Sequence, residues 1–279
     1  MSGRGISSLP KPPAKYRIGK LEKGVVGFET KLEAKNEDAK RIKRCEGTGA
    51  GVLGAPRLAR RLREKKASLA SARHLRTERD RVLSNVWQVV DQTGYTNAST
   101  VTAIPRGWLI PAGQLHKVDP RRLIHQLRAH FYRYGAKAGE GFLIGFLHGE
   151  YDPATDKIQI HFHAVVSGRM RSVLDRSRAG WSYRHLDEFG RRLPVKGVRR
   201  SLLPLSNMPR PITYLLKSYW PSKWTGKTGS GDRIKQGRPS RIPDPRHTEV
   251  LVWLDRWSLE DIKLTIGVRA SSRGFRLSG

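Results

Sequence analysis

The sequence has little cysteine, few acidic residues and no long apolar run. Its 279 residues include one cysteine, Cys45, which excludes an intrachain disulfide framework and fits a reducing compartment. No apolar run approaches the roughly 20 residues that a membrane-spanning helix needs. The N-terminal residues lack the apolar core of a secretion signal. We therefore expect a soluble cytoplasmic protein with no membrane partner.

Basic residues greatly outnumber the acidic ones. The chain carries 54 Lys and Arg against 24 Asp and Glu, a formal net charge of +30. Such an excess indicates a polyanionic partner, and nucleic acid is the commonest one. The length, together with the absence of internal repeats, suits one main domain with appendages.

Composition divides the chain into four expected parts. Residues 1–56 are rich in Lys, Gly and Pro and have weak periodicity, so we expect a basic disordered arm. Residues 57–95 place Leu and Val at near-helical spacing among many arginines, which predicts a basic helical extension. Residues 96–224 hold the compact pattern of a domain. Residues 225–279 begin as a Gly- and Pro-rich loop and end in a short helical segment.

The compact part alternates strand and helix patterns. Residues 100–104 and 141–150 read as strands, and Asp119 with Pro120 marks the start of an intervening helix. Residues 152–156 form a turn into a further strand, so the last two strands are expected to pair as an antiparallel hairpin. Helical material follows. This order favours an α+β fold in which helices flank a central antiparallel sheet.

The strand at 158–166 carries two histidines on one face. Alternation places the apolar Ile158, Ile160 and Phe162 on one side and His161 with His163 on the other. Neutral imidazole is the commonest metal ligand in proteins, and two on one face of a strand are close enough to hold one divalent cation. The alternative is a pair of ordinary histidines on a half-exposed strand.

A third ligand is expected from the neighbouring strand, where His148 and Glu150 lie on one face. A carboxylate suits Mg²⁺ or Mn²⁺, so Glu150 is preferred, although the pattern alone does not separate it from His148. His148 is equally well explained as a core histidine. Two histidines and one such group leave coordination positions open for a substrate oxygen.

A tyrosine and a lysine stand out in the segment between Pro211 and Pro221. These prolines suit the start and the end of a helix. Within that helix Tyr214 lies opposite the apolar stripe, with Lys217 on the same polar side, whereas Tyr219 falls on the stripe. A tyrosine beside a cation can act as a covalent nucleophile once its proton is lost. The alternative is an ordinary surface helix.

Residues 169–200 interleave aromatic side chains with arginines. That composition suits base stacking and phosphate contacts on single-stranded nucleic acid, although a basic surface loop would have the same composition. The candidate nucleic-acid-binding residues are Arg169, Arg171, Arg176, Arg178, Trp181 and Arg184.

Taken together, the hydrophobic first strand, the His-Phe-His strand and the later Tyr-Leu-Leu-Lys segment resemble the HUH endonucleases. The likeness covers roughly residues 99–221 and is greatest to the rolling-circle replication initiator (Rep) proteins, because the tyrosine follows the histidines. It implies a ferredoxin- or RRM-like sheet and a Mg²⁺ or Mn²⁺ ion held by His161, His163 and Glu150 or His148.

The resemblance also implies an activity. Tyr214 would cut single-stranded or extruded origin DNA of a plasmid, phage or integrated element, leaving a 5′-phosphotyrosine and a free 3′-OH, with Lys217 assisting. A host helicase and polymerase would be partners. A single-tyrosine HUH transposase would use the same chemistry, and a non-catalytic basic nucleic-acid-binding protein is the alternative outside the enzymes.

Overall fold

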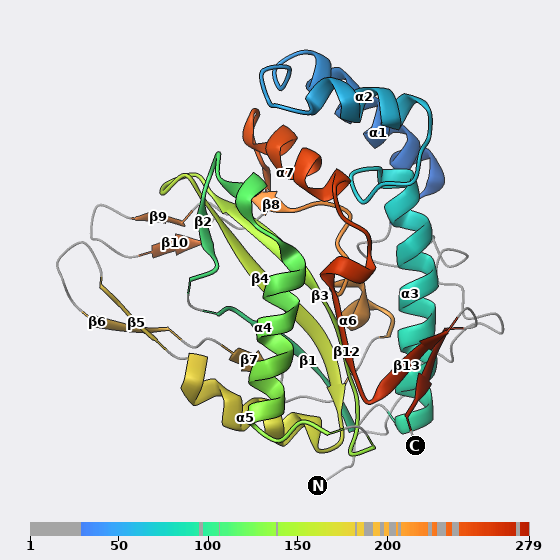
Figure 1. The fold of residues 1–279 in the computed structure, drawn as a ribbon, viewed down its shortest axis with the longest axis vertical. Coiled ribbons are helices and arrows are strands. Elements are labelled where there is room, and N and C mark those ends of the chain that lie inside the picture. The colour runs from blue at the N-terminus through green and yellow to red at the C-terminus, as the bar shows by residue number, and fades with distance from the viewer. Residues whose placement is uncertain are drawn as a thin grey trace, which may run out of the picture.

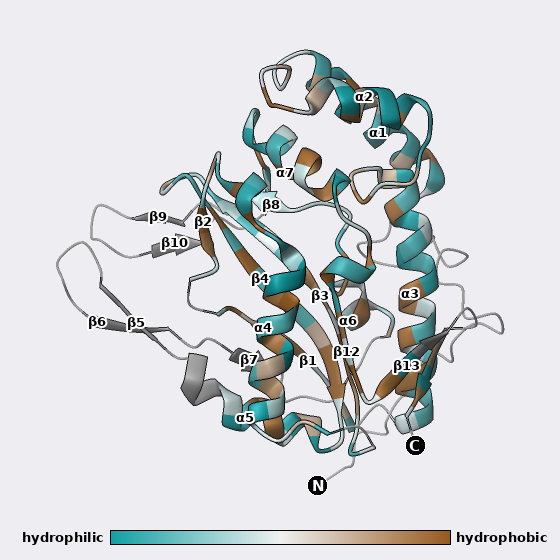
Figure 2. Ribbon diagram, viewed as in Figure 1, coloured by the Kyte–Doolittle hydropathy of each residue, from teal (hydrophilic) through white to brown (hydrophobic). Residues whose placement is uncertain are grey.

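The computed structural model describes residues 29–94, 97–105, 107–137, 139–181, 183–186, 192–195, 198–200, 205, 208–222, 225–227, 233–235, 240–271 and 274–278. These residues form an α+β fold in which helices surround one large sheet (Figure 1). The strands of that sheet are rich in apolar residues, whereas α1 (Lys31–Glu46) and α2 (Ala55–Arg63) are largely hydrophilic (Figure 2). The expected fold class is confirmed at this level.

Strand β4 (Lys157–Ser167) lies at the centre of the sheet. It pairs antiparallel with β3 (Leu143–Asp152) on one side and β1 (Ala98–Ala103) on the other. The path continues through β8 (Pro221–Ser222) and β11 (Ser240–Arg241) beyond β3, and through β7 (Val198–Arg200) beyond β1. The sheet is mixed rather than purely antiparallel, because β3 and β8 run parallel.

The β3–β4 hairpin has the register that its turn chemistry predicts. Asp152 accepts a hydrogen bond from the Ala154 N–H at 3.0 Å, and Asp156 adopts a positive φ of 48°. The Tyr151 hydroxyl donates to Asp156 at 2.8 Å across the turn. These local contacts fix the pairing, which extends from Asp152↔Lys157 to Leu143↔Val166.

Helix α4 (Pro120–Arg133) forms as the sequence predicts. The Asp119 carboxylate accepts from the Arg121 N–H at 2.9 Å, and Pro120 occupies the first helical position. Leu127 and Phe131 are fully buried in the main core. The helix ends before Gly135, whose φ of 87° suits glycine.

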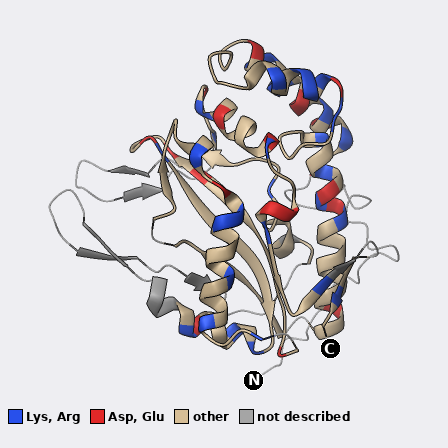
Figure 3. Ribbon diagram, in the orientation of Figure 1, with Lys and Arg blue, Asp and Glu red and all other residues tan. Residues whose placement is uncertain are grey.

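Residues 29–56 differ from the basic disordered arm expected over 1–56, and residues 1–28 of that arm lie outside the described part of the chain. Residues 31–46 form α1, which opens with a capping box between Thr30 and Glu33. The four residues that α1 buries are Ala34, Asp38, Arg41 and Cys45. Two of them are charged, so hydrophobic periodicity could not reveal this buried face. Figure 3 shows α1 and α2 carrying much of the basic charge of the described chain.

The expected division at residues 95 and 225 also differs from the structure. Helix α3 (Ala72–Thr93) contributes Val86 and Trp87 to the main core, so it is part of the domain rather than an extension. At the other end, β12 (Lys263–Ile266) pairs with β3, and α7 (Arg246–Asp255) buries Trp253 in the same core. One core therefore runs from Leu69 to Phe275.

The remaining elements are short apart from α5. They are β2 (Leu109–Pro111), η3 (Leu115–Lys117), α5 (Met170–Trp181), β5 (Tyr183–Leu186), β6 (Arg192–Val195), α6 (Arg210–Thr213), β9 (Thr225–Lys227), β10 (Arg233–Lys235), η4 (Glu260–Ile262), β13 (Val268–Ser271) and β14 (Gly274–Leu277). Among the described residues, none of the helices combines the length and the apolarity needed to cross a membrane.

Candidate active site

Three histidines and a glutamate gather on one face of the central sheet. The register places His148 directly opposite His161, and Glu150 opposite Gln159. Directly opposed residues of an antiparallel pair share a face, so His148, Glu150, His161 and His163 all project to the same side. The predicted juxtaposition of the two strands is therefore present.

The two histidines of β4 approach each other through their Nε2 atoms, which are 2.9 Å apart. Their rings are nearly perpendicular, with an interplanar angle of 84°. The Nδ1 atom of His163 lies 2.9 Å from the Thr102 hydroxyl on β1, and that of His161 lies 3.3 Å from the Gln159 carbonyl. Each ring is thus held by a contact at its Nδ1 atom, and the two Nε2 atoms point toward each other.

The spacing of the two Nε2 atoms fits two ligands of one octahedral cation. Adjacent donors at about 2.1 Å from Mg²⁺, separated by a right angle, lie about 3.0 Å from each other. A hydrogen bond between the two imidazoles gives the same separation. A third donor does not lie as close, and within the described part of the chain no three His, Cys, Asp or Glu side chains are grouped so that they could hold a metal ion together.

The two candidates for the third ligand have different surroundings. The Nε2 atom of His148 is 2.6 Å from the Leu215 carbonyl and must carry its proton, because a carbonyl only accepts. Burial, with the nearby His161, holds the pKa of His148 well below its usual range. Glu150 keeps a side chain 21% exposed, and its Oε1 is 3.7 Å from His161 Nε2. Glu150 thus directs a carboxylate oxygen toward His161, whereas the ring of His148 binds the backbone.

The helix predicted over residues 211–220 is wrong in length. Helix α6 ends at Thr213, and the chain from Tyr214 to Trp220 is neither helix nor strand. The carbonyls of Leu215 and Ser218 accept from the side chains of His148 and Arg41. In a helix these carbonyls would accept hydrogen bonds from backbone N–H groups four residues later. Here they accept from side chains of distant residues instead.

The prediction for the side chains of this segment holds for most of them. Ile212, Leu215 and Leu216 are buried, and Tyr214 is 51% exposed. The sequence predicts that Tyr219 packs with these apolar residues, but 36% of it is exposed. The Lys217 ammonium lies 5.4 Å from the centroid of the Tyr214 ring, so the predicted pairing of tyrosine and cation is present.

The segment crosses the edge of β3 directly beside the histidines. His148 contacts the Leu215 carbonyl on one face of the sheet. Gly149 points to the other face, and any side chain there would overlap the ring of Trp220. Pro221 and Ser222 then join the sheet as β8. The chain that carries Tyr214 is thereby fixed to the strand that carries His148 and Glu150.

The predicted nucleic-acid-binding residues lie in α5 and next to it. The exposed Arg169 pairs with Glu140 at 3.0 Å, and Arg176 donates to the Tyr134 carbonyl at 2.9 Å. Arg171 is half-buried at the first turn of α5. The side chains of the other three, Arg178, Trp181 and Arg184, lie outside the described part of the chain.

Two residues of this region escaped the sequence analysis. Thr102 faces His163 across the β1–β4 pair, and strand alternation in β1 could have pointed to it. Arg41 lies 177 residues before Ser218, so no pattern of neighbouring residues predicts their contact.

Comparison with models of protein families, with curated proteins and with solved structures found no match for this chain.

Proposed function

We propose that this protein is a metal-dependent DNA nickase of the HUH type that initiates rolling-circle replication. The observation that carries the proposal is the convergence of His161 Nε2 and His163 Nε2, 2.9 Å apart, on the central strand. The Tyr214 segment is bonded to the adjacent strand through His148. The order of the elements, with β1, β3 and β4 preceding the tyrosine, supports the same proposal.

His161 and His163 would hold Mg²⁺ or Mn²⁺, with Glu150 as the third ligand after rotation of its partly exposed side chain. When bound, such an ion supplies positive charge to the oxygens of the scissile phosphate. Thr102 orients the ring of His163, because its hydroxyl lies on the Nδ1 side and leaves Nε2 facing the site. The protein thus directs two imidazole nitrogens toward the same point.

Tyr214 supplies the nucleophile in this proposal. The phenol gives its proton to water, its oxygen forms a bond to phosphorus as the bond from phosphorus to the 3′ oxygen breaks, and the leaving oxygen takes a proton from water as the free 3′-OH. The 5′ end stays on the protein as a phosphotyrosine. Lys217, beside the Tyr214 ring, balances negative charge as the phenol loses its proton.

The substrate in this proposal is single-stranded or extruded origin DNA. The net charge of +30 supports a grip on the phosphate backbone that weakens as salt rises. A helicase and a polymerase of the host would unwind the duplex and extend the 3′-OH. A transposase would use the same residues and differ in the DNA ends that it cuts.

The test is a covalent adduct. The full chain is incubated with Mn²⁺ and labelled single-stranded oligonucleotides tiled across the DNA that surrounds its gene, then denatured and separated by size. We expect labelled protein that resists denaturation, with the DNA mapped by mass spectrometry to Tyr214. Tyr214→Phe should abolish the adduct, and Tyr219→Phe is the matched control because it removes the same atom five residues away.

Retention of DNA without any adduct, at every oligonucleotide and with either metal, would instead support the non-catalytic binding protein. In that protein the close His161–His163 contact is a hydrogen bond between two imidazoles. An adduct that maps to Tyr219 would contradict the assignment of Tyr214 while leaving the reaction type intact.

A further inference from the structure

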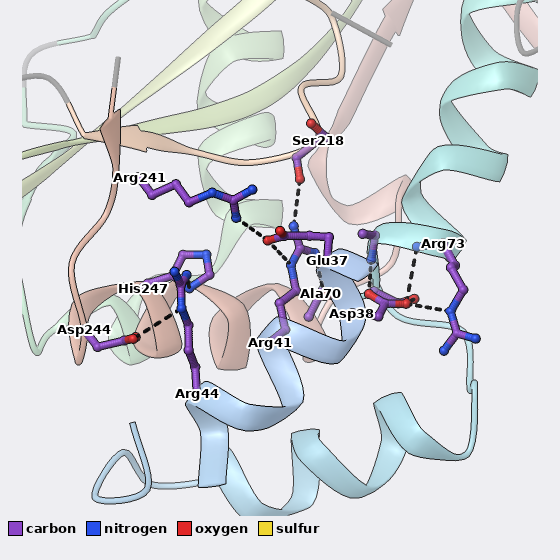
Figure 4. A network of polar contacts seen from close by, with 12 residues as sticks. Glu37, Asp38, Arg41, Arg44, Ala70, Arg73, Ser218, Arg241, Asp244 and His247 are labelled. Carbon is purple, nitrogen blue, oxygen red and sulfur yellow. Dashed lines mark hydrogen bonds and ion pairs between the residues drawn. The ribbon is translucent and has the colours of Figure 1, made fainter. Parts of the chain in front are cut away.

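A buried arginine of the N-terminal helices reaches the segment that carries Tyr214. Arg41 on α1 is 2% exposed. Its Nη1 donates to the Ala70 carbonyl at 2.8 Å, and its Nη2 donates to the Ser218 carbonyl at 3.0 Å (Figure 4). One planar guanidinium therefore joins α1, the chain before α3, and the segment between α6 and β8.

The guanidinium is fixed on its third side by a carboxylate. Arg41 Nε donates to Glu37 Oε1 at 3.3 Å, and the same oxygen pairs with Arg241 of β11 (Figure 4). The Arg241 guanidinium lies 5.6 Å from the centroid of the Tyr219 ring. A charge removed from water needs such a partner and further acceptors, and Arg41 has Glu37 and two backbone carbonyls. Its position leaves little freedom.

The segment from Tyr214 to Trp220 depends on contacts of this kind. It has no helical or strand pairing of its own, and two of its carbonyls are held by buried side chains. His148 holds the Leu215 carbonyl and Arg41 holds the Ser218 carbonyl. The two hydrogen bonds lie on either side of Lys217 and follow Tyr214 in the chain. Together they hold the backbone from which both side chains project.

We infer that Arg41 is a positioning residue for the nucleophile and that α1 is part of the nicking machinery. The inference rests on the proposed function, in which Tyr214 attacks the phosphate. Arg41 acts through the Ser218 carbonyl, and its donors are turned to backbone oxygens inside the protein. It differs in this from the exposed arginines, whose role in the proposal is to bind phosphates.

Lysine cannot replace arginine in this role. A guanidinium presents its donors in a flat, rigid fork that serves two carbonyls and a carboxylate at once, whereas an ammonium is a single point on a flexible stem. Arg41→Lys keeps the charge and loses the fork. It is therefore the variant that separates positioning from charge.

The experiment compares Arg41→Lys with Leu127→Ala in the full chain. Leu127 is fully buried on α4 and belongs to the main core. Its truncation lowers the stability of the fold and removes none of the hydrogen bonds that hold the Tyr214 segment. Three quantities are measured: the rate of adduct formation with Mn²⁺, the Kd for the same oligonucleotide, and hydrogen exchange of the amides of residues 215–219.

We expect Arg41→Lys to slow adduct formation by about tenfold to 100-fold, because a displacement of about 1 Å at a reacting atom has effects of that size. Its Kd should stay within about twofold, since phosphate contacts elsewhere dominate affinity. Exchange of the 215–219 amides should accelerate. Leu127→Ala, compared at a temperature that gives equal folded fractions, should keep both the wild-type rate and the slow exchange.

Equal losses of rate in the two variants would overturn the inference, because they would trace to stability alone. A wild-type rate in Arg41→Lys would overturn it as well. If the unaltered protein forms no adduct, the proposed function fails and the catalytic part of the inference fails with it. The exchange data would then decide whether Arg41 still orders the segment.

Discussion

Lowering the pH should destabilise this protein through His247, a buried histidine of α7. Its Nδ1 lies 3.0 Å from Nη1 of Arg44, and the side chain is 3% exposed. An arginine only donates, so Nδ1 must be the acceptor and the ring must be neutral. Burial, followed by the positive charges of Arg41 and Arg44, lowers the pKa of His247 from 6.5 to about 4. Figure 4 shows Arg44 between His247 and Asp244.

The size of the effect follows from the two pKa values. The unfolded chain takes up the proton near pH 6.5 and the folded chain only near pH 4, so the unfolded state binds more protons in between. The contribution of the neutral His247 to the free energy of unfolding is fully present above pH 6.5. It falls with the pH, by about 2 kcal/mol at pH 5 and about 3 kcal/mol at pH 4. Below pH 4 it changes little further.

The assay is urea unfolding followed by tryptophan fluorescence at a series of pH values from 7.5 to 4. His247→Asn is the matched variant, because the asparagine oxygen replaces Nδ1 as the acceptor for Arg44 and does not titrate in this range. The wild type should lose about 2 kcal/mol more than the variant between pH 7 and pH 5. Parallel curves for the two proteins would refute the assignment of a neutral His247.

Three further changes test other parts of the structure. Gly149→Ala should lower the free energy of unfolding by about 1–3 kcal/mol, because the new methyl group meets the Trp220 ring; unchanged urea unfolding would contradict that packing. Cys45, buried and with its pKa raised by that burial to about 11, should resist iodoacetamide at pH 8 until the chain unfolds, and rapid labelling of native protein would show that α1 opens. His161→Ala and His163→Ala should each abolish the adduct while leaving DNA retention within about threefold; a double variant with full activity would remove the metal site from the proposal.

The parts of this structure that the sequence predicts are those governed by neighbouring residues. Asp119 and Pro120 start α4, the turn at 152–156 sets the β3–β4 register, and alternation aligns His161 with His163. Each of these depends on contacts within a few positions of the residue. The same local chemistry explains why the candidate histidines and the tyrosine with its lysine could be selected in advance.

The parts that the sequence did not predict depend on distant partners. The helix after Pro211 ends early because His148 and Arg41 take the carbonyls of Leu215 and Ser218. Helix α1 was overlooked because it buries charged residues, which find their partners in other elements. A pattern of apolar residues carries no information on either event.

The pairing of β12 with β3 has a consequence for how the chain is made. Residues 143–146 of β3 find their outer neighbour in Lys263–Ile266, which are synthesised well after β3. Until residues 263–266 leave the ribosome, a nascent chain presents an open edge with the apolar sequence Leu-Ile-Gly-Phe. Such an edge recruits strands from other chains. Premature termination before residue 263 should therefore produce inclusion bodies rather than a smaller soluble protein.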